Sequence, residues 1–466
     1  MLFSSITFLY YFLPCVLLLY AIAPKSLKNL ILLVSSLIFY AWGEPKYIFL
    51  MLGSIFSAFI FGILIDKFRE TNFSKVCFIA SVVCSIGSLG FFKYADFFIE
   101  NVNAIFSSNL ALLNIALPIG ISFYTFQILS YTIDLYKGKV AVQKNFLDFA
   151  TYVALFPQLI AGPIVRYADV QEQLASRKHS VDDVAYGVQR FVLGLAKKVL
   201  IANQIGQLSN ILHASDDKSI LTYWLYAICV MLHIYFDFSG YSDMAIGLGR
   251  IFGFRFLENF NYPFISTSIT EFWRRWHMSL GSWFRDYVYI PLGGNRGTKG
   301  KLFFNIFVVW FLTGFWHGAA WNFVVWGLYF GVFLVLEKFL IGEKLNAIPV
   351  VKFVYTFVVL AVSFVIFNAT DMGEAVTFIQ GMFGMTGVPF VTTHFMYYLQ
   401  SYAAIIIVSS FGATPVPKLI VAKIEGTKMG ENVLVVLRPI VLVALMLLVT
   451  AYLVNGSFNP FLYFRF

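Results

Sequence analysis

The feature that most constrains this chain is a succession of apolar segments, each long enough to cross a bilayer, along almost its whole length. A transmembrane helix needs about 20 mainly apolar residues. Charged residues make up 12% of the chain, about half of the usual fraction in a soluble domain, so little polar surface is left to face water. We therefore predict a single all-α integral membrane domain over residues 1–466, with no soluble domain. Its expected parts are N-terminal spans, a motif-bearing core and C-terminal spans, at about 1–145, 146–340 and 341–466.

The apolar segments predict a polytopic helical bundle of about 11–12 spans. Loops rich in Lys and Arg alternate with less basic ones, and this alternation places both termini outside. The apolar start of the chain could be taken for a signal peptide, but it lacks a basic region before the apolar run, so we expect it to be retained as the first span. The predicted spans are 6–23, 30–43, 47–65, 76–92, 108–131, 182–208, 219–240, two spans or one broken span within 303–336, 350–368, 394–411 and 434–455.

Three further segments are predicted not to cross the membrane. Residues 149–165 are apolar but short, and two prolines and a glycine interrupt them, which favours a re-entrant segment. Residues 250–301 contain eight basic and three acidic residues among many aromatic ones, a mixture typical of interfacial helices at the level of the lipid headgroups. We place them on the cytoplasmic face. Residues 369–393 contain no Lys or Arg and are expected outside.

Charge and cysteine usage exclude several other classes of protein. The net charge of +9 does not indicate nucleic-acid binding, because Lys and Arg gather in cytoplasmic loops through insertion bias and anionic lipids. The four cysteines lie in apolar stretches without CxxC spacing, so we interpret them as apolar side chains and expect no metal site. The chain also lacks a GxxxxGK[ST] phosphate loop, an HExxH motif and a GxSxG elbow.

His317 is the strongest candidate for chemistry. It lies about fourteen residues into the apolar run 303–336, within the sequence TGFWHGAAWN. At 1.5 Å per residue it is roughly 20 Å from the cytoplasmic edge, inside a hydrocarbon core of about 30 Å. Ionisable residues at such a depth are costly and usually functional. A neutral imidazole can act as a general base or carry an acyl group; the alternative is a histidine that only bonds across helices.

Other polar residues in apolar surroundings are weaker candidates. His277 follows RRW and is either an interfacial structural residue or part of the chemistry. His233 and Asp237 are four residues apart and share a helix face, so they form either a proton relay or a polar pair that satisfies itself. Asp237 and Asp243 are expected to line a polar cavity or to brace the site. The remaining histidines are expected at the surface or the interface: His179, His213 and His394.

Four blocks of the sequence together resemble the membrane-bound O-acyltransferase superfamily. They are FPQLIAGP at 156–163, Tyr235–Gly247, Phe272–Arg296 and Gly314–Gly327. Within the superfamily, FRDYVY followed by PLGGNR is similar to the membrane subunit of the bacterial alginate O-acetyltransferases. The D-alanyl transfer proteins of teichoic acid modification share RWHMSL and WHG with this chain.

The resemblance implies a bundle that encloses a funnel, with the family's invariant histidine at His317 and its second important histidine at His277. Both are therefore expected to be catalytic. Residues expected to bind the donor or the substrate, or to support the two histidines, are Asn322, Asp237, Asp243, Arg285, Asp286, Arg296 and Trp316.

The implied activity is acyl transfer across the cell membrane. A cytoplasmic acyl donor, either acetyl-CoA or an acyl-carrier thioester, is expected near the basic segment 250–301, since positive charge attracts an anionic carrier. No tightly bound cofactor is expected. The implied partners are membrane lipids, a secreted or membrane-anchored acyltransferase and an exported polysaccharide or cell-wall glycan. D-alanyl transfer to teichoic acid is the alternative reaction, and a transporter without chemistry would leave the two histidine blocks unexplained.

Overall fold

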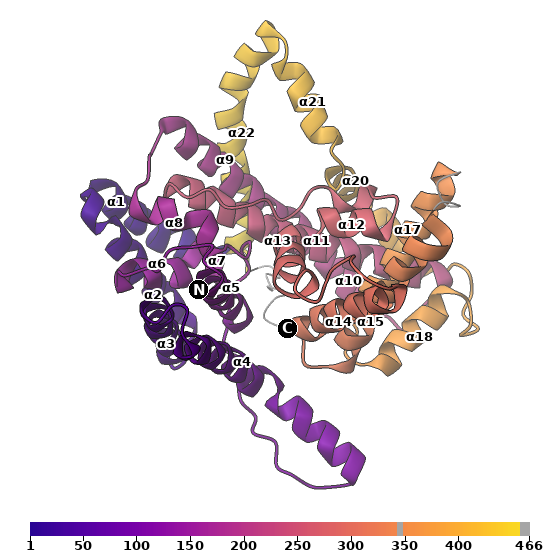
Figure 1. Ribbon diagram of the computed structural model, residues 1–466. Coiled ribbons are helices and arrows are strands. Elements are labelled where there is room, and N and C mark those ends of the chain that lie inside the picture. The colour runs from indigo at the N-terminus through magenta and orange to yellow at the C-terminus, as the bar shows by residue number, and fades with distance from the viewer. Residues whose placement is uncertain (343–347, 457–466) are drawn as a thin grey trace. The chain divides into compact units, whose positions relative to one another are not determined.

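The computed structural model describes residues 1–342 and 348–456, and Figure 1 shows the course of the chain. Within these ranges every regular element is a helix, which confirms the predicted all-α class. By length and composition, seven helices can cross a membrane; the pair α19 (Thr393–Ser401) and α20 (Ala403–Gly412), bent by 62°, would add an eighth span. The chain is thus a multi-pass membrane protein. The sequence predicted more spans. The predicted span 6–23 forms a shorter helix, Phe8–Ile22, and 108–131 is helical only from Ile121.

The helices group into two compact units. Unit 1 comprises Met1–Phe191 and Ser242–Leu257, and unit 2 comprises Val192–Tyr241 and Glu258–Phe466. The long helix α11, Ile220–Ile251, contributes residues to both units. The prediction of one membrane domain over the whole chain is not tested by this grouping and stays a prediction.

Unit 1 contains two short buried helices, α6 (Phe146–Ala154) and α7 (Phe156–Leu159). Every residue of 149–165 is buried, and the backbone N–H of Phe156 donates to Ser36 Oγ at 3.0 Å. Neither helix is long enough to cross a bilayer, in agreement with the prediction that this segment is not a span. The other helices of the unit are η1 Phe8–Phe12, α1 Leu13–Ile22, η2 Lys25–Leu27, α2 Lys28–Gly43, α3 Ile48–Lys67, α4 Asn72–Phe106, α5 Ile121–Tyr136, α8 Tyr167–Ala175 and most of α9 Val181–Ala196.

The predicted span 108–131 is wrong in its first half. Residues 107–120 form no helix, and α5 begins only after Gly120. The backbone N–H of Leu113 donates to the Asp96 carboxylate of α4 at 2.7 Å, so the apolar segment folds back along α4. Gly120 then turns the chain at φ +77°, where a Cβ would stand 2.7 Å from the Leu159 carbonyl oxygen. Apolar composition alone could not reveal these contacts.

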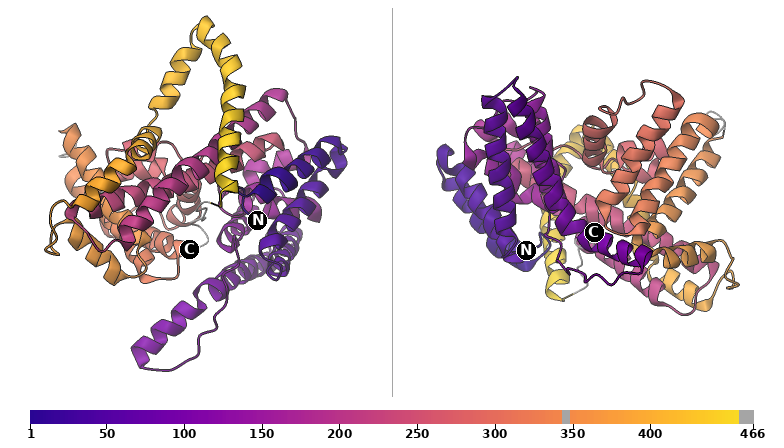
Figure 2. Two further views of the ribbon diagram at one scale, coloured as in Figure 1. Left: turned by 180° about the vertical axis from the view of Figure 1, so that it is seen from behind. Right: turned by 60° about the horizontal axis from the view of Figure 1, so that its bottom comes forward.

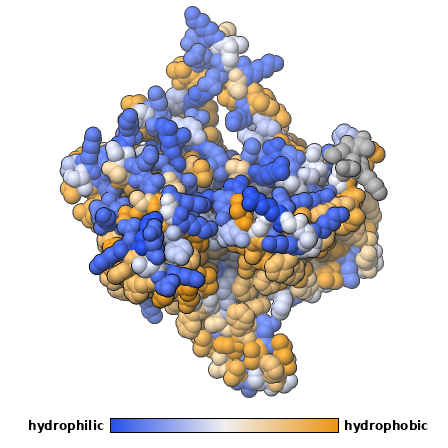
Figure 3. Space-filling view, in the orientation of Figure 1, coloured by the Kyte–Doolittle hydropathy of each residue, from blue (hydrophilic) through white to orange (hydrophobic). Residues whose placement is uncertain are grey.

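Hydrophobic side chains cover the end of α4 and the segment that follows it (Figure 3). Ile105 and Phe106 are each 74% exposed, and Leu110 is 53% exposed. A patch of this kind on a membrane protein is suited to contact with lipid.

Unit 2 contains α14 (Lys299–His317) and α15 (Trp321–Leu336), which pack side by side (Figure 1). The apolar run 303–336 thus forms two helices, as predicted. Gly314 and Gly327 allow the close approach: a Cβ on Gly327 would stand 2.3 Å from the Trp310 carbonyl oxygen. The other helices of the unit are η3 Lys197–Ala202, α10 Asn203–Ala214, the first part of α11, η4 Pro263–Ile265, α12 Ile269–Arg275, α13 Met278–Phe284, η5 Arg285–Tyr289, η6 Glu337–Ile341, α17 Pro349–Asn368, α18 Met372–Met382, α19, α20, α21 Val416–Glu425 and α22 Lys428–Val454.

Helices α21 and α22 form a hairpin, drawn in yellow in Figure 2. Arg438 of α22 and Glu425 of α21 form an ion pair at 2.8 Å. The body of α22 is apolar and almost wholly exposed, which is typical of a helix that faces lipid. The turn of the hairpin is hydrophilic (Figure 3). Of the lysines in the predicted basic loop, Lys423 and Lys428 lie beside the turn, and Lys418 lies near the start of α21.

Candidate active site

A small cavity in unit 2 is enclosed by one histidine, one aspartate and several aromatic rings. Its volume is about 20 Å³, room for about one water molecule. His317 and Asp237 are the ionisable residues in its wall. An imidazole enclosed in this way can meet a substrate without competition from bulk water. The apolar lining consists of Ile234, Phe238, Phe272, Trp276, Trp326, Phe330, Phe364 and Phe367.

His317 occupies the C-terminal end of α14 and is 5% exposed. Its ring packs edge-on against Trp326 and Phe367, with centroid distances of 5.0 and 5.3 Å. The next residue is Gly318. A Cβ at this position would stand 2.3 Å from the ring of Phe323, so there is no room for a side chain. The burial predicted for this histidine is confirmed, and its surroundings fix the plane of the imidazole.

The second predicted histidine, His277, lies in the same unit and is joined to His317 through Trp316. The Trp316 ring is 6.0 Å from that of His277 and 5.0 Å from that of His317, centroid to centroid. His277 is 1% exposed, and Phe238 of α11 packs against it at 4.7 Å. Burial lowers the pKa of His277 to about 3, so its imidazole is neutral at physiological pH.

Asp237 forms a buried ion pair with Lys198. Its carboxylate oxygen lies 2.6 Å from Lys198 Nζ, and the two side chains are 1% and 2% exposed. Lys198 belongs to the π-helical turn η3, a type of distortion that is frequent at functional sites. The sequence indicated Asp237, but it gave no sign that a lysine 39 positions earlier would be its partner. His233, the other member of the predicted pair, packs its ring against Gly206.

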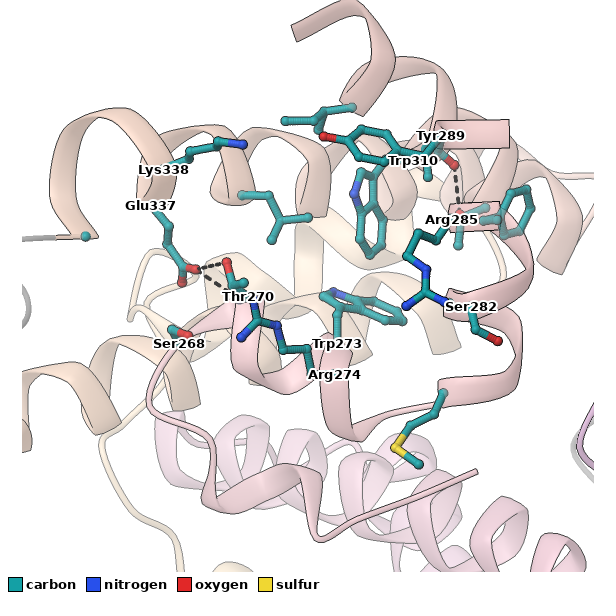
Figure 4. Close-up of a pocket in the computed structure, with 18 of the residues that line it drawn as sticks. Ser268, Thr270, Trp273, Arg274, Ser282, Arg285, Tyr289, Trp310, Glu337 and Lys338 are labelled. Carbon is teal, nitrogen blue, oxygen red and sulfur yellow. Dashed lines mark hydrogen bonds between the residues drawn. The ribbon is translucent and has the colours of Figure 1, made fainter. Parts of the chain in front are cut away.

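A larger cavity of about 1300 Å³ lies in the same unit and is basic and aromatic. Its lining includes the indoles of Trp273 and Trp310 and the ring of Tyr289. In Figure 4 the guanidinium groups of Arg274 and Arg285 lie on either side of the Trp273 indole. The cations in the wall are Arg274, Arg285, Lys338 and Lys352, and the acidic residue is Glu337.

Glu337 forms hydrogen bonds with the first residues of α12. Its carboxylate accepts hydrogen bonds from the backbone N–H groups of Ile269 (2.6 Å) and Thr270 (2.9 Å), and from Thr270 Oγ1 (2.8 Å). A carboxylate at this position satisfies the free N–H groups of a helix and complements its dipole. Glu337 therefore stabilises the wall of the cavity, and the cations give the cavity its net positive charge.

The two cavities approach each other along α14. Thr313 lines the larger cavity and precedes His317 by four residues, so the two lie on one face of α14, about 6 Å apart along its axis. Trp273, also in the larger cavity, packs at 4.9 Å against Phe330 and at 5.7 Å against Trp326, both in the wall of the small cavity. Aromatic rings from the two walls are thus in contact between the two cavities.

The remaining predicted residues of unit 2 do not line the small cavity around His317. Arg285 lines the larger cavity and binds Asp286 through two hydrogen bonds of 2.7 and 3.1 Å. Arg296 is exposed in the turn before α14. Asn322, at the start of α15, donates to the Ala369 carbonyl oxygen at 2.9 Å and so ties α15 to the end of α17.

Asp243 belongs to unit 1, where it forms an ion pair with Arg190 at 2.8 Å. The structure therefore groups His317, His277, Trp316 and Asp237 in unit 2 and assigns Asp243 to the other unit. Sequence reasoning missed Lys198 and Glu337, and it missed Asn259, whose side-chain oxygen lies 3.1 Å from His277 Nδ1. They lie far along the chain from the residues that they bind, so no local pattern could have indicated them.

The helices and the enclosed histidine define a multi-pass membrane protein with an imidazole held in an apolar enclosure beside a basic cavity. The model of the membrane-bound O-acyltransferase family matches residues 140–368, a range that contains both histidines and both cavities. This chain belongs to that family and is an acyltransferase.

Relatives with assigned names cover most of the chain. The probable alginate O-acetylase of Pseudomonas aeruginosa is 44% identical over 392 residues, which are 82% of this chain and 75% of the relative. The probable alginate O-acetylase of Azotobacter vinelandii is 38% identical over the full length of both chains. The peptidoglycan O-acetyltransferase of Helicobacter pylori is 34% identical over 83% of this chain and 81% of its own length.

Proposed function

We propose that this protein moves an acetyl group from a thioester donor in the cytoplasm, across the cell membrane, to a hydroxyl acceptor outside. The acceptor group belongs, directly or through a secreted partner acyltransferase, to an exported polysaccharide or cell-wall glycan. The observation that carries the proposal is the position of His317, buried in an apolar cavity one helical turn from a large basic cavity. The O-acetyl relatives support acetyl as the transferred group.

The larger cavity is the proposed donor site. The Arg274 and Arg285 guanidinium groups suit the phosphates of CoA, and Trp273 and Trp310 suit its adenine. The same charge would also suit an acidic carrier protein, so a carrier thioester is the alternative donor. Measuring product release from acetyl-CoA and from a carrier thioester distinguishes the two. The acyl end of either donor must pass the contacting rings of Trp273 and Phe330 to reach His317.

In the proposed reaction, His317 acts on the acceptor hydroxyl. The neutral imidazole takes the hydroxyl proton while the oxygen attacks the thioester carbonyl, and it returns the proton to the sulfur when the carbon–sulfur bond breaks. Alternatively, the imidazole nitrogen displaces the thiol, carries the acyl group and transfers it to the hydroxyl. Both routes need a neutral His317 and exclusion of water, because water would otherwise hydrolyse the acyl group.

A cell-based measurement tests the proposal. The acetyl content of the surface polymer is compared between cells that carry the wild type, His317→Ala and His394→Ala, at equal amounts of membrane-inserted protein. His394 is the matched control, since it is 63% exposed at its side chain. We expect loss of acetylation in the His317 variant alone; normal acetylation in that variant would overturn the assignment.

The direction of transfer is tested by cysteine labelling in intact cells. In a variant with serine at Cys15 and Cys84, which are exposed, single cysteines replace Lys299 in the basic segment or Met385 in the segment without Lys or Arg. We expect an impermeant thiol reagent to label position 385 in intact cells and position 299 only after the membrane is opened. Labelling of both positions from the same side would contradict transfer across the membrane.

A further inference from the structure

Asn259 lies in the segment between α11 and η4, is 1% exposed, and binds the turn that carries His277. Its side-chain oxygen Oδ1 is 3.2 Å from the backbone nitrogen of Ser279, 2.9 Å from Ser279 Oγ and 3.1 Å from His277 Nδ1. Its backbone carbonyl accepts from the N–H of Met278 at 3.0 Å. One asparagine thus binds three consecutive residues: His277, which precedes α13, and the first two residues of that helix.

These contacts determine which nitrogen of His277 carries the hydrogen. The backbone N–H of Ser279 can only donate, so the amide atom that faces it is the oxygen. An amide oxygen can only accept, so His277 Nδ1 must be the donor in its own contact. A neutral imidazole has one N–H group, which leaves Nε2 with a free lone pair.

The lone pair of Nε2 is buried, and within residues 1–342 and 348–456 it has no hydrogen-bond partner. Trp316 and Phe238 pack around the ring. A buried acceptor without a partner is costly, and such atoms in native structures call for a reason, such as a bound substrate. The ring of His277 lies next to Trp316, which also contacts His317. This position favours a bound substrate as the partner of Nε2.

The backbone of His277 is strained, which supports a role beyond packing. Its φ and ψ angles are +44° and +51°, in the left-handed region that a residue with a side chain rarely adopts. Strain of this kind persists where the surroundings enforce it, and it concentrates at functional sites. Here the Met278 and Ser279 N–H groups, both bound by Asn259, enforce it.

We propose that Asn259 is a positioning residue: it holds His277 in the tautomer with hydrogen on Nδ1 and so presents the Nε2 lone pair to an O–H or N–H group of the substrate beside Trp316. This inference rests on the proposed function. It assigns His277 the role of hydrogen-bond acceptor for the substrate, while His317 takes part in the chemistry.

The test compares variants that separate tautomer control from loop stability. Asn259→Leu removes the acceptor and keeps the branched shape of the side chain, and Ser279→Ala removes a hydrogen bond to the same oxygen without touching the Nδ1 contact. A histidine base in the wrong tautomer loses up to about 10⁴-fold in kcat; since free imidazole exchanges between tautomers, we expect roughly a 10- to 100-fold loss in Asn259→Leu. Ser279→Ala leaves the Nδ1 contact in place, so it should stay within about threefold of wild type, the scale of a single hydrogen bond.

Nitrogen-15 NMR of histidine-labelled protein gives the readout that a structural role would not change. The His277 signals are assigned by their loss in His277→Gln. We expect a protonated Nδ1 and an unprotonated Nε2 in the wild type, and a mixture of tautomers in Asn259→Leu. An unprotonated Nδ1 in the wild type, or full activity in Asn259→Leu, would overturn the inference. Full activity in His277→Ala would instead refute the role of His277 in the proposed function.

Discussion

The contact between Gly314 and Gly327 allows a sharp prediction about how α14 positions His317. A Cβ on Gly314 would stand 2.3 Å from the Phe323 carbonyl oxygen and 3.1 Å from Gly327 Cα, about 1 Å short of an ordinary contact. These are backbone atoms, so no side chain can rotate away. Gly314→Ala must therefore move α14 and α15 apart by about that distance.

Two effects follow from this movement. Overpacking of a tight interface costs about 1–3 kcal/mol, so the thermal midpoint in detergent should fall. His317 is the last residue of α14, three positions after Gly314, so the shift reaches its ring directly. A misplacement of about 1 Å in an active site costs on the order of 100-fold in rate, and we expect a loss of that size in acetyl transfer.

Gly300→Ala is the matched control. Gly300 lies in the same helix, and a Cβ there would meet nothing within 4 Å. Alanine is the better helix former by about 1 kcal/mol, so this variant should be as stable as the wild type or more so, with unchanged activity. Equal thermal midpoints and equal rates in the Gly314 and Gly300 variants would refute the argument that glycine contact places His317.

Two further predictions concern the charges around the site. Lys198→Met leaves the Asp237 carboxylate buried without its cation, so we expect it to lower the free energy of unfolding by about 3–5 kcal/mol, measured by thermal unfolding. The double variant Lys198→Met/Asp237→Leu should recover most of that loss. If it recovers none, the loss does not come from the unpaired carboxylate. Arg274→Gln should raise the KM for acetyl-CoA several-fold with little change in kcat, since one of the cations of the larger cavity is lost. Lys299→Gln, at an exposed position outside the lining of that cavity, should leave both constants unchanged; equal effects of the two variants would contradict the assignment of the donor cavity.

The parts of the fold that depend on composition could be predicted from the sequence. The all-α class and the membrane location follow from long apolar runs, and the burial of His317 follows from its place within one of them. The segment 107–120 could not be assigned correctly, because the hydrogen bond from Leu113 to Asp96 and the turn at Gly120 decide its path. Apolar periodicity does not contain that information.

The candidate site was predictable only in part, for a similar reason. A histidine in an apolar run stands out locally, so His317 could be found. The partner of Asp237 could not, because Lys198 reaches it only after α11 packs on the π-helical turn. Asn259 likewise acts through contacts with a turn 18–20 residues away along the chain. Asp243 carried the same signal as Asp237, yet it pairs with Arg190 in unit 1.

The central claim is that acyl transfer depends on the imidazole of His317, and release of CoA by the purified protein tests it most directly. Wild type, His317→Ala and His394→Ala are each supplied with acetyl-CoA and a hydroxyl acceptor, and free CoA is measured over time. We expect release that depends on the acceptor in the wild type and the His394 variant, and none in the His317 variant. Release at the wild-type rate without His317 would contradict the account, and release only from a carrier-protein thioester would transfer the donor assignment to the carrier-dependent reaction.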